Sequence, residues 1–295
     1  MDVNRLGAID IGSNAVKLLI CDVINHKDRI VSKKVAHLRI PLQLGDDTFY
    51  LGYISDKKKD KLAHLIYNFK SFIEISGTED FRICATSALR EARNRSDIIE
   101  FVSATTGVNI ELISTREEAN FLFLGGMNGE YDSDTLYVIV DVGGGCTEIA
   151  LSRNNELVYE ESFKLGTIRI LSRDEEKKEW SRLKEWLEEK RHGHRNICLI
   201  GSGSNINKVN SQFRRRKIKK SDLRGYYRKL HDMNLEERIV NSNLNLNGAE
   251  MILPAINIYL NIMKILKVEI LQVPVIGIAD GIIKDIYLKK QIAGK

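Results

Sequence analysis

The chain has 295 residues, 43% of them hydrophobic and 29% charged, which is ordinary for a globular protein of one large or two medium domains. Only three prolines occur, so a long proline-rich linker is excluded. The net charge of +5 suits an anionic partner without requiring nucleic acid, and no apolar run approaches the ~20 residues of a membrane span. The cysteines are far apart and form no C-x-x-C motif, which argues against a zinc site or a disulfide framework and favours the cytoplasm: Cys21, Cys84, Cys146 and Cys198.

The first third of the chain predicts a three-stranded meander followed by a helix. Residues 6–23 form two strands of a hairpin, and residues 30–40 add a third strand. The stretch LGDDTFYLGYIS, residues 44–55, is predicted to be a loop. Residues 56–75 then place apolar side chains at three-and-four spacing with lysines on the opposite face, which predicts an amphipathic helix.

The next elements complete a βββαβαβ order followed by a helix. FRICAT and NIELIS are expected to be short strands, and between them a helix is expected over 97–106, with Ser96 as N-cap and Gly107 at its end. Thr115-x-x-Glu118 matches a capping box for the following helix, which ends at residues 125–126. A domain boundary is predicted there, giving domains 1–126 and 127–280.

The second half repeats this order of elements. Three strands are expected in YVIVDV, CTEIALS and ELVYEESF, and a capping box, Ser172-x-x-Glu175, precedes a helix. NICLIGSGSNINKV predicts a buried strand, a turn and a short helix. An apolar helix is expected over 251–266, then a late strand and a final helix. The basic run 214–220 is read either as a solvated loop or as a track for a polyanion.

One strand-turn-strand pattern occurs twice, 131 residues apart. AIDIGSNAVKLLI and VIVDVGGGCTEIAL both place an Asp at the end of an apolar strand, followed by an apolar residue, Gly and a small polar turn. We therefore predict one β-hairpin in each half of a duplicated chain. It is no Walker loop, because no Gly-Lys-Ser/Thr follows, and no dinucleotide fingerprint, because a strand resumes where a helix should start.

Three turns of small residues follow buried strands, and together they favour phosphate binding by backbone N–H groups. Taken singly, each turn is equally a tight hairpin or a strand-to-helix connection. The residues are Gly12, Ser13 and Asn14 in the first turn, Gly143, Gly144, Gly145, Cys146 and Thr147 in the second, and Gly201, Ser202, Gly203 and Ser204 in the third.

Several charged residues are candidates for the chemistry. Asp10 and Asp141 end apolar strands, and two such carboxylates facing one cleft would hold a Mg²⁺ that bridges phosphate oxygens. Glu148 would hold metal or position water. A solvent-facing charge is the alternative for Glu148. Arg90 suits bidentate phosphate contact or a surface ion pair, and spacing does not choose. Spacing alone assigns Glu117 to a favourable charge at a helix N-terminus.

The ordered set AIDIGSNAVKLLI, ATSALREARNR, ELISTREEANFLFLGG, VDVGGGCTEIAL and IGSGSN resembles the exopolyphosphatase / guanosine-pentaphosphate phosphohydrolase (Ppx/GppA) family of the actin-like ATPase superfamily. The motifs span roughly residues 6 to 210, and VPVIGIADGI near the end fits as well. The resemblance implies an α/β fold of two ribonuclease-H-like domains with the active site in the cleft between them. It also implies that the last helix, 281–293, packs back on the first domain.

The family removes terminal phosphates from inorganic polyphosphate, or the 5′ γ-phosphate from guanosine pentaphosphate, with Mg²⁺. The resemblance assigns the catalytic acid that orients or deprotonates water to Glu117. It assigns Asp141 and Glu148 to metal or water and Arg90 to phosphate contact, and the strand-end position of Asp10 makes it a further candidate metal ligand. Mg²⁺ or Mn²⁺ is the expected cofactor. The expected partner is one of these phosphate substrates, with no nucleic acid or membrane and with a homodimer as an option.

Three positions depart from the family pattern, and they leave a second function class open. Thr115 replaces a Gly, Cys146 replaces a Ser and so lacks a strong hydroxyl donor, and Gly248 stands where many relatives have Arg. The lead hypothesis is an exopolyphosphatase. The alternatives are a guanosine-pentaphosphate phosphohydrolase and a sensor that binds nucleotide or polyphosphate without hydrolysing it. A sugar kinase is weaker, because no sugar-binding signature is recognisable.

Overall fold

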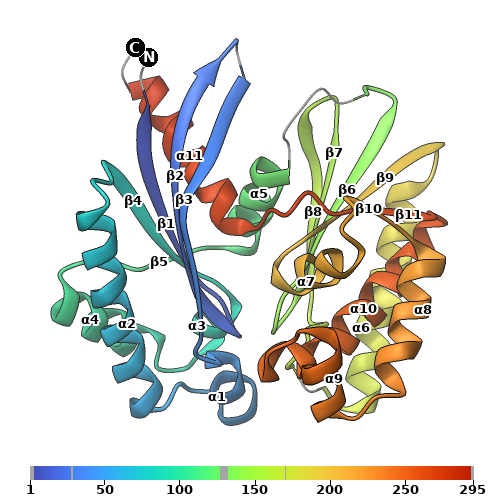
Figure 1. The fold of residues 1–295 in the computed structure, drawn as a ribbon, viewed down its shortest axis with the longest axis horizontal. Coiled ribbons are helices and arrows are strands. Elements are labelled where there is room, and N and C mark those ends of the chain that lie inside the picture. The colour runs from blue at the N-terminus through green and yellow to red at the C-terminus, as the bar shows by residue number, and fades with distance from the viewer. Residues whose placement is uncertain (1–2, 28, 127–131, 170, 294–295) are drawn as a thin grey trace. The chain divides into compact units, whose positions relative to one another are not determined.

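The computed structural model describes residues 3–27, 29–126, 132–169 and 171–293, which form two compact α/β units (Figure 1). The first unit contains residues 1–125 together with 278–295, and the second contains residues 126–277. The predicted fold class, two ribonuclease-H-like α/β domains, is confirmed by the strand order described below. The active-site cleft stays a prediction.

The first unit is built on a five-stranded sheet in the order β3-β2-β1-β4-β5. The first three strands are antiparallel and the last two are parallel to β1. The strand bounds are β1 Asn4–Ile11, β2 Ala15–His26, β3 Arg29–Pro41, β4 Asp80–Ala85 and β5 Glu111–Leu112. The helices are α1 Leu44–Leu51, α2 Asp56–Ile75, α3 Ser87–Glu91, α4 Arg95–Thr106, α5 Thr115–Gly126 and α11 Ile278–Ala293.

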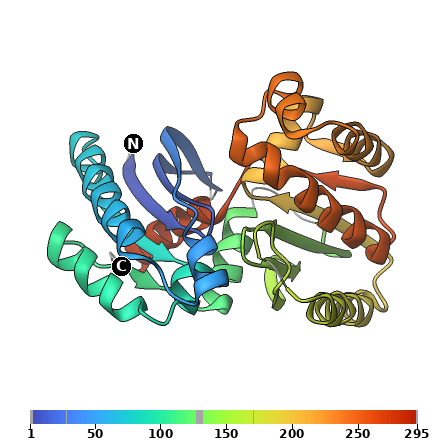
Figure 2. The same ribbon diagram turned by 90° about the horizontal axis from the view of Figure 1, so that it is seen from below.

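Both faces of this sheet are covered, because side chains alternate along each strand. One face of β1 and β2 packs against α2 and α4, which lie side by side in Figure 2. The opposite face packs against α11, whose Ile282, Ile283 and Ile286 are buried there. The last described helix of the chain is therefore part of the core of the first unit.

The second unit repeats this topology in the order β8-β7-β6-β9-β11, with β10 added antiparallel at the edge. The strand bounds are β6 Thr135–Val142, β7 Thr147–Arg153, β8 Glu156–Phe163, β9 Asn196–Ser202, β10 Lys217–Lys219 and β11 Ile270–Gln272. The helices are α6 Arg173–Arg191, α7 Ser204–Phe213, α8 Lys220–His231, α9 Leu235–Ser242 and α10 Leu246–Leu266. The capping box of Ser172 and Glu175 at the start of α6 is confirmed.

Helix α10 is the central helix of this core. Among the described residues it alone is long and apolar enough to cross a membrane by length and composition, a length of apolar segment that was not expected from the sequence. In this unit it packs against the strands and α6 through its buried side chains, among them Ile252, Ile256 and Met263. The helix begins five residues before the predicted position, because the Asn245 side chain caps it by accepting from the Gly248 amide at 2.8 Å.

Two local predictions in the first unit are wrong. The stretch predicted as a loop contains α1, which starts after Gln43 in a left-handed conformation and ends at Gly52 with φ 79°. Leu44 and Thr48 are buried in that helix, so packing stabilises a segment whose Asp-Asp pair is typical of a turn. The N-cap of α4 is Asn94 instead of Ser96, and the Asn94 side chain bonds the backbone of Ile54.

The basic run, residues 214–220, forms a turn, the edge strand β10 and the first residue of α8. Ile218 in the middle of β10 is buried, and its neighbours Lys217 and Lys219 are exposed. The run is therefore an ordered edge of the second sheet. Its proposed use as a polyanion track stays a prediction.

Candidate functional site

Asp10 ends β1 with its side chain on the face of the first sheet that also carries Lys17. The two residues are partners in the antiparallel register, and Lys17 Nζ lies 2.8 Å from Asp10 Oδ2. Asp10 is 1% exposed. A buried carboxylate needs a compensating cation, and here the neighbouring strand supplies it.

The first small-residue turn is held from two sides. The Gly12 amide donates to the Ala15 carbonyl at 3.1 Å and closes the hairpin. The carbonyls of Ser13 and Asn14 accept from backbone amides at the start of α1, including Gly45 at 2.8 Å. The misassigned helix α1 therefore has a role at the site, because it fixes the shape of the turn.

Arg90 lies on α3, directly after β4, and joins two further elements. Its Nη1 donates to the Ile113 carbonyl at 2.9 Å and to Glu118 Oε2 at 3.1 Å. Glu118 is 3% exposed. The ion pair between Arg90 and Glu118 is therefore mostly shielded from water, unlike the surface ion pair that was the alternative for Arg90.

The capping box of α5 is shifted by one residue from its predicted position. Ser114, rather than Thr115, is the capping residue, because its amide and hydroxyl both donate to Glu117 Oε2 at 2.8 Å. The Glu117 amide donates back to Ser114 Oγ at 3.2 Å. The hydrogen bonds from Ser114, first from its amide and then from its hydroxyl, lower the pKa of Glu117. Glu117 therefore caps the helix, and Glu118 points into the protein.

In the second unit, Asp141 and Glu148 are directly opposite each other on β6 and β7. Each is 5% exposed, so both carboxylates lie in a protected position at the end of the strand pair. Their neighbourhood contains the glycine turn that joins the two strands. The register therefore brings together two of the three residues that the resemblance assigned to catalysis.

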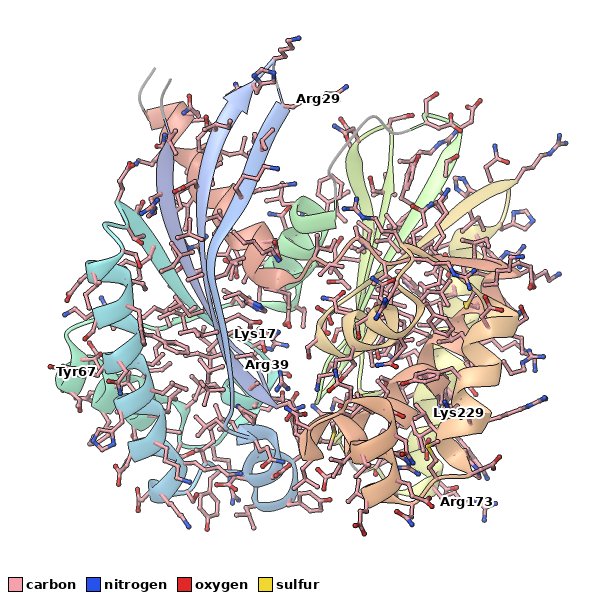
Figure 3. The ribbon with its side chains drawn as sticks, in the orientation of Figure 1. Lys17, Arg29, Arg39, Tyr67, Arg173 and Lys229 are labelled. Atoms are coloured by element: carbon pink, nitrogen blue, oxygen red, sulfur yellow. The ribbon has the colours of Figure 1, made fainter. Side chains whose placement is uncertain are left out.

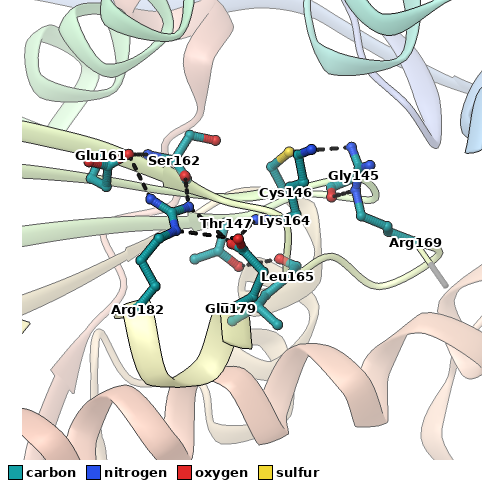
Figure 4. A network of polar contacts seen from close by, with 10 residues as sticks. All are labelled: Gly145, Cys146, Thr147, Glu161, Ser162, Lys164, Leu165, Arg169, Glu179 and Arg182. Atoms are coloured by element: carbon teal, nitrogen blue, oxygen red, sulfur yellow. Dashed lines mark hydrogen bonds and ion pairs between the residues drawn. The ribbon is translucent and has the colours of Figure 1, made fainter. Parts of the chain in front are cut away.

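The turn of residues 143–147 is anchored by the segment that follows β8 (Figure 4). The amides of Ile168 and Arg169 donate to the Gly144 carbonyl at 2.9 and 3.1 Å, and Arg169 Nε donates to the Gly145 carbonyl at 2.5 Å. Thr147 Oγ1 donates to the Leu165 carbonyl at 2.6 Å. Because the carbonyls of Gly144 and Gly145 point toward this segment, the turn has a fixed orientation.

Arg169 also reaches the departure at Cys146, with Nη2 3.7 Å from the Sγ atom (Figure 4). The Cys146 side chain is 4% exposed. A thiol accepts hydrogen bonds only weakly. This contact therefore orients the guanidinium less firmly than the hydrogen bond from Arg169 Nε to the Gly145 carbonyl does. Arg169 is thus a cation of the second turn that the sequence analysis missed.

The third turn lies next to Asp141. Gly203 has φ 91°, and a Cβ atom there would overlap the Asp141 carboxylate, so only glycine fits. Ser202 Oγ is 3.5 Å from Asp141 Oδ2, and Ser204 begins α7. An N-terminus of α7 beside this turn is the kind of position at which helices bind anions.

Tyr259 of α10 contacts the two strands that precede the second and third turns. Its hydroxyl lies 2.9 Å from the Val140 carbonyl and 3.0 Å from the Ser202 carbonyl, so it bridges β6 and β9. Complete burial raises the pKa of this phenol well above its ordinary value, and the Asp141 carboxylate raises it further. Tyr259 is therefore a neutral donor that fixes the two strands carrying Asp141 and Ser202.

The remaining departure, Gly248, lies in the first turn of α10. A Cβ atom at this glycine would meet the ammonium of Lys208. Lys208 Nζ is also 3.3 Å from Asn245 Oδ1. A lysine from α7 therefore occupies the space that a side chain at position 248 would need.

The carboxylate oxygens at this site are of the type that a divalent cation would bind. Among the described residues no cluster of three or more His, Cys, Asp or Glu side chains is arranged to hold a metal. Asp141 and Glu148 supply two opposed carboxylates, and Mg²⁺ is commonly bound by one or two carboxylates together with water and phosphate oxygens. Asp10 lies beside the Lys17 ammonium, which offsets part of the charge that a metal ligand would offer.

Three residues at these positions were missed for different reasons. The pairing of Lys17 with Asp10 could have been predicted from the hairpin, because Lys17 lies seven residues after Asp10 on the returning strand. Glu118 was hidden by two overlapping Ser/Thr-x-x-Glu matches that differ by one residue. Arg169 lies 23 residues from Cys146 in the chain, and no local pattern indicates that contact.

Comparison with known proteins identifies relatives along most of the chain. Residues 23–290 match the model of the Ppx/GppA phosphatase family. The chain is 29% identical over 198 residues to exopolyphosphatase 1 of Mycobacterium tuberculosis, covering 66% of this chain and 53% of that protein. It is 27% identical over 259 residues to a bifunctional 3-dehydroquinate synthase/phosphatase of Fusobacterium nucleatum, covering 81% of this chain and 38% of that protein. The chain thus spans about half the length, or less, of these curated relatives.

Solved structures share the fold at lower sequence identity. An exopolyphosphatase from Cytophaga hutchinsonii superposes with a TM-score of 0.84 at 20% identity, covering 97% of this chain and 98% of that one. The Ppx/GppA family member of Aquifex aeolicus gives a TM-score of 0.79 at 20% identity, covering 98% of this chain and 99% of that one. With the match over residues 23–290, these findings show that the chain belongs to the Ppx/GppA phosphatase family.

Proposed function

We propose that this chain is a phosphohydrolase that releases the terminal phosphate of inorganic polyphosphate by metal-assisted attack of water. The observation that carries the proposal is the opposed pair of buried carboxylates, Asp141 and Glu148, beside a glycine turn of fixed orientation. The family and the exopolyphosphatases among its relatives support the same chemistry. Phosphoryl transfer depends mainly on positioning and charge neutralisation, which these groups can supply.

Asp141 and Glu148 would hold the cation, Mg²⁺ or Mn²⁺, with Asp10 as a further ligand or as a charge that positions Lys17. When bound, such a cation neutralises charge on the phosphate oxygens. The amides of the turns at 12–14 and 143–147 and the N-terminus of α7 would bind phosphate oxygens. Arg90 and Arg169 would add guanidinium contacts, which suit phosphate geometry.

The water-positioning acid is either Glu117 or Glu118, and the contacts favour Glu118. Glu117 accepts two hydrogen bonds from Ser114, which hold its Oε2 atom in the helix cap. Glu118 is buried and held by Arg90, so its carboxylate has a fixed direction in a protected place. A group that orients water needs such a direction more than it needs high basicity.

Phosphate release from long-chain polyphosphate with Mg²⁺ tests both parts of the proposal. Glu148→Gln should abolish most turnover while leaving the fold intact, because it removes a charge without changing the shape of the side chain. Glu118→Gln should lower kcat by about 10²-fold or more, as expected for loss of a general base or water-positioning group. Glu117→Gln is the matched control, with the same change one residue away. A larger loss for Glu117→Gln would return the role to that residue.

Two alternatives are tested with the same protein. Guanosine pentaphosphate is the other substrate implied by the resemblance, and direct competition with polyphosphate decides between them. The weak thiol contact between Cys146 and Arg169 favours the sensor hypothesis, because it orients the Arg169 guanidinium less firmly than a serine hydroxyl would. Tight binding of polyphosphate by calorimetry, with no phosphate released over hours in Mg²⁺ or Mn²⁺, would establish a sensor and refute the hydrolase.

We further propose a cytoplasmic location. All four cysteines are free thiols, and burial raises the pKa of Cys21 and Cys84 to about 12, so both stay protonated and poorly reactive. Free thiols of this kind are typical of proteins in a reducing compartment. A homodimer stays an option that sedimentation of the purified protein would decide.

A further inference from the structure

A row of cationic residues crosses the first sheet from Asp10 toward the edge strand. Lys17 of β2 is the register partner of Asp10 on one side and of Arg39 on the other. Figure 3 shows Lys17 and Arg39 beside each other on the two strands. Because paired residues project to the same face, the two cations lie next to each other on the face that carries Asp10.

The row continues along β3. His37 pairs with Leu19, and after a bulge at Ile20/Cys21 the next residue on this face is Lys34, the partner of Cys21. Lys34 Nζ lies 3.1 Å from Asp280 Oδ1 of α11, which confirms that it faces the side covered by that helix. We call Lys17, Arg39, His37 and Lys34 the β2–β3 stripe. Residues two apart on a strand are separated by about 7 Å, so the stripe is long enough for several anionic groups.

The cations around His37 create a positive potential at its ring. His37 is exposed on β3, but partial loss of its hydration lowers its pKa first, and Lys34, Lys17 and Arg39 lower it further, against an opposing effect of Asp280. Burial also lowers the pKa of the Arg39 guanidinium, so its charge is held where water stabilises it poorly. A bound anion is therefore attracted more strongly to Arg39 than to an arginine that is fully exposed to water.

A simpler role for these cations is protection of the sheet edge. Charged residues on edge strands prevent pairing with other chains, and β3 is an edge strand. That role does not require Lys17, which lies on the interior strand β2, or an arginine as buried as Arg39. The alignment of the cations with Asp10 across three strands is therefore unexplained by edge protection.

We propose that the β2–β3 stripe binds the phosphate groups of a polyanionic chain that lie beyond the group being cleaved. The stripe begins at the strand ends next to the turn of residues 12–14 and leads outward along β3. A ligand with one or two phosphates fills only the turn, and a longer chain reaches Arg39 and then Lys34. The inference rests on the proposed function for its choice of ligand, and its test does not depend on turnover.

His37 supplies a direct readout. Its ring signal is assigned in NMR spectra by comparison with His37→Asn and titrated from pH 4.5 to 8.5, with a chelator present so that no metal-dependent hydrolysis occurs. Saturating tripolyphosphate should raise the pKa of His37, because a bound anion stabilises the imidazolium. Arg39→Gln should abolish this increase. The matched control is Arg29→Gln, which removes the same charge at the other end of β3, and there the increase should persist (Figure 3).

The corresponding kinetic result uses long-chain polyphosphate. Arg39→Gln should raise KM roughly tenfold, the effect of losing about 1.4 kcal/mol of charged hydrogen bonding, and leave kcat within about twofold. Arg39→Lys should rescue KM in part, which also shows that the strand is intact. The proposal is overturned if saturating tripolyphosphate, with binding verified by calorimetry, leaves the pKa of His37 unchanged. It is also overturned if tripolyphosphate does not bind, or if Arg29→Gln and Arg39→Gln have equal effects.

Failure of the stripe and failure of the hydrolase are distinguishable. Hydrolysis of polyphosphate with an unchanged His37 pKa would refute phosphate binding by the β2–β3 stripe and support the phosphohydrolase proposal. A raised His37 pKa without any phosphate release would support phosphate binding by the β2–β3 stripe and favour the sensor hypothesis.

Discussion

Substitution of Gly166 by alanine tests whether the orientation of the second turn matters for chemistry. A Cβ atom at Gly166 would lie 2.5 Å from the carbonyl carbon of Gly145 and would overlap the carbonyl oxygen of Gly144. Ordinary van der Waals contact begins at 3.4 Å, so the turn must retreat by 3.4 − 2.5, or about 1 Å. Both neighbours are backbone atoms, and no flexible side chain can absorb the shift.

A displacement of about 1 Å near reacting groups can lower the rate by about 10²-fold, and overpacking of this kind costs about 1–3 kcal/mol of stability. The assay is phosphate release from polyphosphate together with thermal unfolding, so that the loss of kcat is corrected for the folded fraction. Gly225→Ala is the control, because nothing lies within 4 Å of a Cβ atom there. It should stabilise α8 by roughly 0.5–1 kcal/mol and leave turnover unchanged. Wild-type kcat in Gly166→Ala would refute the reasoning.

Three other substitutions have separate expected outcomes. Tyr259→Phe should lower the free energy of unfolding by about 1–3 kcal/mol, because two strand carbonyls lose a buried donor; unchanged urea denaturation would contradict this. Burial lowers the pKa of Lys284 to about 8 from an ordinary 10.5, so the folded state binds fewer protons between these values and stability should rise with pH by about 3 kcal/mol. Lys284→Met should lack this rise, and an identical pH profile would exclude the mechanism. Ser114→Ala should cost about 1 kcal/mol in urea denaturation and raise the pKa of Glu117; equal stability would show that the cap is unimportant.

The sequence predicted the features that local periodicity determines. The repeated Asp-x-Gly hairpin identified both β1–β2 and β6–β7, because an acid at the end of an apolar strand is unusual at either position. Helix α2 has the predicted bounds, 56–75, since its apolar spacing is regular. The capping box at Ser172 was equally clear.

Features that depend on tertiary packing were not predictable in the same way. Helix α1 is stabilised by the burial of Leu44 and by a Thr48 hydroxyl that donates to the Ala88 carbonyl 40 residues away. The one-residue shift of the α5 cap cannot be read locally, because Ser114 and Thr115 both fit the capping pattern. The burial of Glu118 accompanies that shift, whereas the catalytic role of Glu117 was implied by the resemblance alone.

The return of α11 to the first sheet has a consequence for synthesis on the ribosome. The side of that sheet containing Leu6, Leu19 and Val23 is covered by a helix made only after all of the second unit. The second unit is continuous in sequence and can fold as soon as it emerges. The unit that begins first is thus completed last, and one apolar side of its sheet stays uncovered until α11 has been synthesised.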